Sequence, residues 1–128
     1  MYDSGYDAYR QSEIQVKAAT ASPAQLVLML LDGLMDELAR AEGHLLARNY
    51  ERKGTSIKKC LRILGGLDVS LDRQSGGPLA ENLHQLYAFC GRHLFKASLR
   101  NDVDGFRHVA KLMGNIREGW QGFAQRVS

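Results

Sequence analysis

The sequence of 128 residues contains few of the features that interrupt helices or anchor a chain in a membrane. It has only two prolines, Pro23 and Pro78, so long helices are permitted on either side of each. The longest apolar run, Leu26 to Leu31, is far shorter than the roughly 20 residues that span a bilayer. Residues 1–5 form neither a basic nor an apolar stretch. We therefore expect no signal peptide, no membrane insertion and a cytoplasmic location.

Cysteine is equally scarce, which limits the chain to one disulfide at most. Cys60 and Cys90 both fall within apolar helical patterns. A free thiol in that setting behaves as a small hydrophobic side chain in a reducing compartment. We expect two buried, unpaired cysteines.

The sequence also lacks a strong excess of one charge, because its net charge is only +3. Its positive residues are scattered, and the one modest basic patch is made of Arg48, Arg52, Lys53, Lys58, Lys59 and Arg62. Glu51 interrupts this patch, which also lacks a platform of aromatic side chains on which bases could stack. A solvated helix face is the preferred interpretation, and we expect no binding of nucleic acid.

Patterns that would indicate catalysis or a metal centre are incomplete. A di-iron bundle needs two Glu-x-x-His turns, and only Glu81 and His84 form one. Cys90 and His93 could share a zinc ion, but two ligands do not make a site. Neither a nucleophile elbow nor a phosphate-binding loop is present. The sequence predicts no enzyme activity, no catalytic residues, no metal and no cofactor.

Capping and turn residues divide the chain into helices. Ser22 can cap a helix that begins at Pro23, with Gln25 completing a capping box. Asn49 can cap the next helix, and residues 73–78 form the clearest turn. We predict one domain, 1–128, comprising a segment at 1–20 and long helices at 22–48, 50–71, 78–100 and 103–124.

Apolar residues recur at steps of three and four in every predicted helix, which indicates a buried face. In the last helix this face comprises Phe106, Val109, Ala110, Met113, Ile116, Trp120 and Phe123. No segment shows the alternation of a half-buried strand. Short links between long helices favour antiparallel neighbours, so the sequence predicts an all-α, antiparallel up-down four-helix bundle.

The first 20 residues differ from the rest, because Tyr2, Tyr6 and Tyr9 lie at steps of four and three. A short helix there would place the three rings on one face. Such a helix is too short to be stable alone, so we expect it to dock on the bundle or on a partner.

The run Leu26–Leu31 is wider than a buried stripe, since six consecutive apolar residues cover the whole circumference of a helix. Two explanations remain open: this helix is flanked on two sides, or its surplus face binds an apolar segment. Glycines inside the predicted helices also indicate a soft bundle that can repack around a partner, because each costs up to about 1 kcal/mol relative to alanine.

Taken in order, short motifs along the whole chain resemble a known family. They are Tyr2, Gly5, Ala8-Tyr9, Ala21-Ser22-Pro23, Gln25-Leu26, Met29-Leu30, Asp32-Gly33, Ile57, Ile63, Leu67, Leu71-Asp72, Gly76-Gly77, Ala80, Asn82-Leu83, Leu86-Tyr87, Asn101-Asp102, Ile116-Arg117 and Trp120. In their order and spacing they resemble the flagellin-specific export chaperones, the FliS family. One departure is Leu31, where the family commonly has tyrosine.

The resemblance implies a helical bundle that binds the disordered C-terminal segment of flagellin and prevents premature polymerisation. It also implies delivery to the cytoplasmic domain of the export-gate protein FlhA, with Tyr6 and Tyr9 at the docking positions. For flagellin we expect apolar contacts from Leu26, Val27, Leu30, Leu34, Leu83, Leu86 and Tyr87. Tyr87 and Trp120 also suit the core.

Two other hypotheses remain. One is a different non-catalytic adaptor or a self-associating bundle, in which the surplus apolar face forms a weak homodimer. The other, an enzyme with a metal–carboxylate centre, has the incomplete ligand pattern described above.

Overall fold

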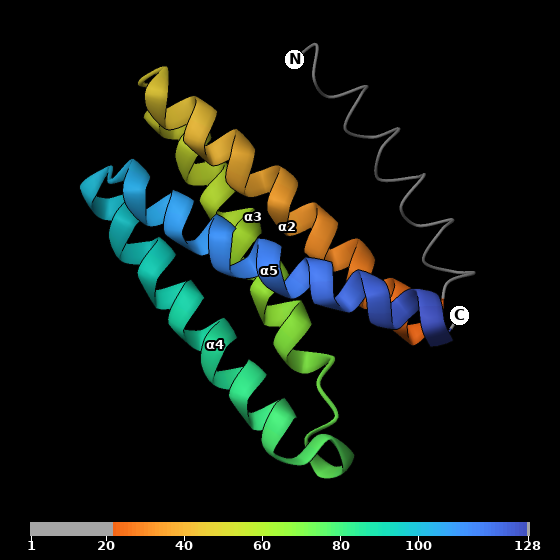
Figure 1. Ribbon diagram of the computed structural model, residues 1–128. Helices are drawn as coiled ribbons and strands as arrows, with labels where there is room; N and C mark the ends of the chain where they lie inside the picture. The colour runs from red at the N-terminus through yellow and green to blue at the C-terminus, as the bar shows by residue number, and fades with distance from the viewer. Residues whose placement is uncertain (1–21, 128) are drawn as a thin grey trace.

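Four helices make up the part of the chain that the structure describes. The computed structural model describes residues 22–127, apart from the side chains of residues 73–75 and 127. The helices are α2 (Pro23–Leu46), α3 (Tyr50–Val69), α4 (Arg73–Arg100) and α5 (Val103–Val127) (Figure 1). Each packs on the next, and α5 returns to α2, which closes a ring of antiparallel neighbours. The predicted all-α four-helix bundle is confirmed, whereas the predicted N-terminal segment lies outside the described residues.

The predicted capping box begins α2. The Ser22 hydroxyl accepts a hydrogen bond from the Gln25 amide at 3.2 Å, and Gln25 Oε1 accepts one from the Ser22 amide at 3.1 Å. Asn49 caps α3 in the same way, with its side-chain oxygen accepting from the Arg52 amide at 3.2 Å. Local sequence therefore fixes where both helices begin.

The stretch predicted as a turn before Pro78 contains additional helix. Helical backbone already begins at Arg73 and is interrupted at Gly77, whose φ of 55° lies in the left-handed region. Glycine adopts that conformation without the steric cost that a Cβ atom would bring. The main part of α4 then continues from Pro78, in agreement with the helix-opening role expected of proline.

The core lies between all four helices and is almost entirely apolar. Its fully buried side chains are Leu31, Leu34, Cys60, Leu67, Cys90, Leu94, Phe106, Val109 and Met113. Both cysteines are free, as the pattern predicted. Leu31, the departure from the family pattern, is among these core residues, so leucine fills this position as a packing residue.

The position of Lys53 differs from the one that the sequence predicted. The residue was assigned to a solvated basic face, but its side chain is buried. Its Nζ donates to the Ser98 carbonyl at 2.8 Å and to the Ser98 hydroxyl at 3.1 Å. The long aliphatic stem crosses the α3–α4 interface, and these bonds offset part of the cost of burying the charge.

Polar contacts attach α5 to α2 along most of its length. Near its start, Arg107 Nη2 donates to Glu42 at 3.0 Å. Farther along, the Arg117 guanidinium donates to Asp32. Near the end, Trp120 Nε1 donates to the Ala24 carbonyl at 2.8 Å. These three contacts define one continuous α2–α5 interface.

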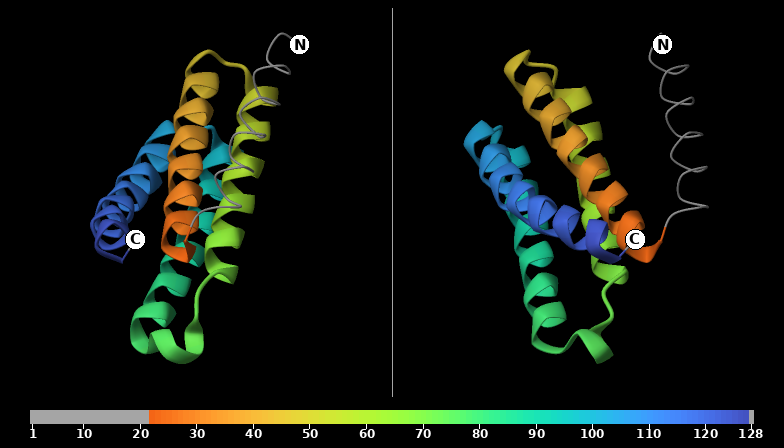
Figure 2. Two further views of the ribbon diagram at one scale, coloured as in Figure 1. Left: turned by 90° about the vertical axis from the view of Figure 1, so that its right-hand side faces the viewer. Right: turned by 45° about the vertical axis from the view of Figure 1, so that its right-hand side comes forward.

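By contrast, α5 approaches α4 closely only near the link at residues 101–102. A Cβ atom added at Gly105 would lie 2.4 Å from Ala97 Cβ, so the two backbones nearly touch there. From that point α5 diverges from α4 and ends beside the start of α2 (Figures 1 and 2). The second half of α5 and the first half of α4 therefore do not face each other closely.

We predict that Gly105→Ala destabilises the protein, although alanine favours helix. The added methyl would force α5 away from α4, and overpacking of this kind costs about 1–3 kcal/mol. Gly119→Ala is the matched control, because nothing lies within 4 Å of a Cβ atom at that position. It should instead stabilise by up to about 1 kcal/mol. Urea unfolding of both variants measures the difference, and equal shifts would contradict the close contact.

We also predict that both thiols resist alkylation in the folded protein. Burial raises the pKa of Cys60 to about 12 and that of Cys90 to about 11, so neither forms the reactive thiolate at about pH 8.5. Mass spectrometry after iodoacetamide treatment should find both unmodified in buffer and both modified in urea. Rapid labelling of either in buffer would show that the core opens there.

Candidate client-binding surface

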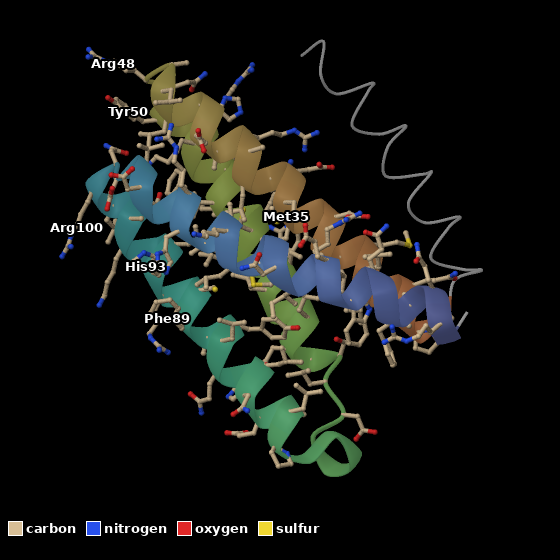
Figure 3. All side chains as sticks on the ribbon, viewed as in Figure 1. Met35, Arg48, Tyr50, Phe89, His93 and Arg100 are labelled. Carbon is tan, nitrogen blue, oxygen red and sulfur yellow. The ribbon has the colours of Figure 1, made fainter. Side chains whose placement is uncertain are left out.

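The divergence of α5 from α4 leaves apolar side chains half-buried on both helices. Phe89 and His93 of α4 contact His108 of α5, with ring centroids 6.3 Å and 5.2 Å from that of His108. Because both contact His108, the rings of Phe89 and His93, which Figure 3 labels, mark the side of α4 that faces α5, and His108 marks the facing side of α5. Beyond the ring contact, the same two sides continue without a neighbouring helix.

The residues that continue these two sides follow from helical spacing. Leu86 precedes Phe89 by three residues, and Leu112 and Ile116 follow His108 by four and eight. We call the resulting set the open α4–α5 seam, which comprises Leu79, Leu83, Leu86, Leu112, Ile116 and Phe123. Leu79 and Phe123 are exposed, and the other four are only partly buried against the core. The seam is therefore an apolar surface without an intramolecular cover among residues 22–127.

A second apolar surface lies on the first turns of α2. Of the run Leu26–Leu31, only Leu31 is fully buried. Leu26 is 38% exposed, while Val27 and Leu30 are partly buried against the core. Although α3 and α5 flank this helix, they do not cover its whole apolar circumference.

The structure divides the seven predicted flagellin contacts into three groups. Leu26, Val27 and Leu30 lie on the exposed start of α2. Leu83 and Leu86 lie on the open α4–α5 seam. Leu34 and Tyr87 are buried in the core, so they support the surface from beneath.

The two exposed groups lie on helices that are not adjacent in the ring, α2 and α4. A segment that contacts both groups must therefore pass over α3 or α5, which lie between them. Tyr6 and Tyr9, the predicted export-gate residues, lie outside the described residues.

Sequence periodicity alone missed the contribution of α5. Ile116, Trp120 and Phe123 were placed on its buried face, yet Phe123 is 40% exposed and the other two are only partly buried. The indole ring of Trp120 contacts Phe123, with centroids 5.0 Å apart. The sequence signal for this contribution was the length of the apolar stripe on α5. In the structure this stripe extends beyond the part of α5 that α4 covers.

The two ligand pairs that the sequence offered for a metal, Glu81 with His84 and Cys90 with His93, acquire no third ligand among the described residues. No three His, Cys, Asp or Glu residues among them gather into a group that could hold a metal ion. His84, part of the single Glu-x-x-His turn, instead pairs through Nδ1 with Asp68 of α3 at 2.7 Å. Cys90 lies in the core, and His93 stacks on Phe89. None of the described helices is long and apolar enough to cross a membrane.

Comparison with known proteins agrees with the family resemblance of the sequence motifs. The profile of the family described as Flagellar protein FliS matches residues 5–127. The flagellar secretion chaperone FliS of Escherichia coli is 41% identical over 118 residues, which cover 91% of this chain and 87% of that protein. The flagellar secretion chaperone FliS of Salmonella typhimurium is 37% identical over 126 residues, or 98% and 93% of the two chains.

A third relative, the flagellar secretion chaperone FliSB of Pseudomonas aeruginosa, is 34% identical over 116 residues. That match covers 91% of this chain and 92% of the relative. Because the family profile and these relatives span nearly the whole sequence, the chain belongs to the FliS family of flagellar proteins.

Proposed function

We propose that this protein is a non-catalytic, cytoplasmic chaperone that binds the C-terminal segment of flagellin. The observation that carries the proposal is the apolar surface left by the divergence of α5 from α4. A partner helix with an apolar face could lie against Leu83, Leu86 and Ile116 and complete the packing that the bundle lacks there.

The start of α2 offers a second contact for the same client. A segment wrapped around the bundle would bury Leu26, Val27 and Leu30 in addition to the open seam. Ordering a disordered segment over two separate surfaces costs conformational entropy, which the burial of apolar area on both must offset. Wrapping of this kind would keep the client segment from associating with other flagellin molecules.

Delivery to the export gate is the second half of the proposal. It rests on family membership and on the tyrosines near the N-terminus. In this proposal Tyr6 and Tyr9 dock on the cytoplasmic domain of FlhA, while the helices hold flagellin. In this proposal FlhA binds the N-terminal segment and flagellin binds the helical bundle.

The first test is calorimetric titration of the protein with a synthetic flagellin C-terminal peptide. Phe123→Ser and Leu26→Ser should each weaken binding about tenfold, because each removes about 1.5 kcal/mol of apolar burial in the complex, the low end of the range for a large apolar side chain. Val69→Ser is the control, since Val69 is 85% exposed at the end of α3 and lies on neither surface. Its affinity should match that of the unmodified protein.

Failure of the unmodified protein to bind at micromolar concentration would exclude the flagellin assignment. In that case, sedimentation that reports a dimer disrupted by Phe123→Ser would support the self-associating bundle instead.

The second test separates the two partners. We expect Tyr6→Ala combined with Tyr9→Ala to leave flagellin binding unchanged and to weaken recruitment of the complex to the FlhA cytoplasmic domain in a pull-down assay. Conservative Tyr→Phe changes at both positions should retain most of the recruitment if the rings supply the contact. Loss of flagellin binding in the alanine variant would show that these rings serve the client.

A further inference from the structure

The outer side of the second half of α4 carries positive charge without any negative charge. No Asp or Glu occurs between Asn82 and Asn101. Arg92, Lys96 and Arg100 are spaced four residues apart, and all three are exposed. Arg100 points away from the bundle near the link to α5 (Figure 3). Since residues at this spacing are neighbours on a helix, the three cations form a row.

Two large apolar side chains lie beside this row. Phe95 is 54% exposed and Leu99 is 71% exposed, and they too are spaced four residues apart. The core is filled from the opposite side of α4 by Cys90, Leu94 and Ala97. Phe95 and Leu99 thus contribute little to the core. Exposing two large apolar side chains to water is unfavourable in free energy, and the packing of the bundle does not require it.

We name these five residues, Arg92, Phe95, Lys96, Leu99 and Arg100, the basic α4 face. The neighbouring helix extends its charge. Lys53 of α3 bonds Ser98, and a Cβ atom at Gly91 would lie 3.8 Å from Leu61 Cδ2. This antiparallel register places Lys58 at the level of His93 and Leu94, just before Phe95, and Arg62 follows Lys58 by one turn along α3.

The cations of this face are not used within the bundle. Among the described residues, none of Arg92, Lys96 and Arg100 forms an ion pair or a side-chain hydrogen bond. On α2 the situation is the opposite: Asp32 and Glu42 pair with arginines of α5. Among the residues whose side chains the structure describes, most cations without an ion pair therefore lie on α3 and α4.

We propose that the basic α4 face docks an acidic amphipathic helix of a partner protein, at a site separate from the client surface. Carboxylates one helical turn apart are about 6 Å apart along the axis, which matches the rise between Arg92, Lys96 and Arg100. Apolar side chains on the same partner helix would cover Phe95 and Leu99. Opposite charges would set the orientation and speed the encounter, and the apolar pair would add buried area.

Because charged and apolar side chains alternate on this face, an acidic protein partner fits it better than an anionic membrane or a nucleic acid does. A membrane-surface helix needs a broad apolar face that sinks into the acyl chains, and here only two apolar residues lie among the cations. Nucleic-acid binding would need the phosphate contacts and stacking rings of a longer basic surface. To bind here, an acidic amphipathic helix requires only the row of three cations and the apolar pair Phe95 and Leu99, and the basic α4 face has both.

The experiment titrates the full-length protein with a labelled synthetic helical peptide that has leucines on one face flanked by glutamates. Binding should weaken with added salt. Lys96→Glu and Phe95→Ser should each lower the affinity about tenfold, since one reverses a charge in the row and the other removes the apolar contact. Arg126→Glu makes the same charge change near the far end of α5 and should have less than about a twofold effect.

Two altered peptides test whether both features are needed. Replacing glutamate with glutamine, or leucine with serine, should abolish measurable binding. Equal binding of the unaltered and the altered peptides, or an equal loss in Arg126→Glu, would overturn the proposal. Stronger Lys96-dependent binding to phosphatidylglycerol vesicles or to duplex DNA than to the peptide would also overturn it.

The flagellin peptide distinguishes this proposal from the client-binding function. The Lys96→Glu and Phe95→Ser variants, shown to be folded by circular dichroism, should bind the flagellin C-terminal peptide like the unmodified protein. Loss of flagellin binding in these variants would assign the basic α4 face to the client and refute a separate site. Failure of flagellin binding in the unmodified protein would reject the proposed function and leave this proposal standing.

Discussion

The position of α5 depends on an unequal division of its contacts between two neighbours. The side chains of Arg107, Arg117 and Trp120 hold it to α2 along most of its length. Its described contacts with α4 lie instead near its start, where Gly105 approaches Ala97 and His108 contacts Phe89 and His93. A helix fixed in this way must lie across α4 at an angle. The open α4–α5 seam is the geometric consequence, because the second half of α5 cannot cover α4 and follow α2 at the same time.

This arrangement leaves apolar side chains exposed that would add folding stability if they were buried. Each large apolar side chain left exposed forgoes about 1.5–3 kcal/mol that full burial would provide. The glycine content takes on a more specific meaning here. Gly33, Gly91, Gly105 and Gly114 face side chains of neighbouring helices, while nothing lies within 4 Å of a Cβ atom at Gly43, Gly65 or Gly119. Within these two sets, close packing requires glycine only at Gly105, because a Cβ atom at the other three positions of the first set would make ordinary van der Waals contact at 3.6–3.8 Å. The other glycines of the two sets fit the general softness inferred from the sequence.

The sequence was a good guide to local structure and a poorer one to what each helix face touches. The Ser22 and Asn49 caps and the buried cysteines follow from local chemistry and spacing, because those signals act within a few residues. The burial of Lys53 depends on Ser98, which is distant in sequence, and nothing near Lys53 indicates it. Likewise, periodicity predicts the apolar side of α5 but cannot tell where α4 stops covering it, so the exposure of Phe123 emerged only from the fold.

The different sides of α4 carry different chemistry, which is what the two proposed binding sites on one small bundle require. One side, with Cys90 and Leu94, fills the core, and another, with Leu86, borders the open α4–α5 seam. The basic α4 face points elsewhere, since Phe95 and Lys96 follow the buried Leu94 but are both exposed. Ala97 is buried on the core side of the same turns and packs against Gly105 of α5. One short stretch of α4 therefore holds α5 on its inner side and presents the cationic row on its outer side.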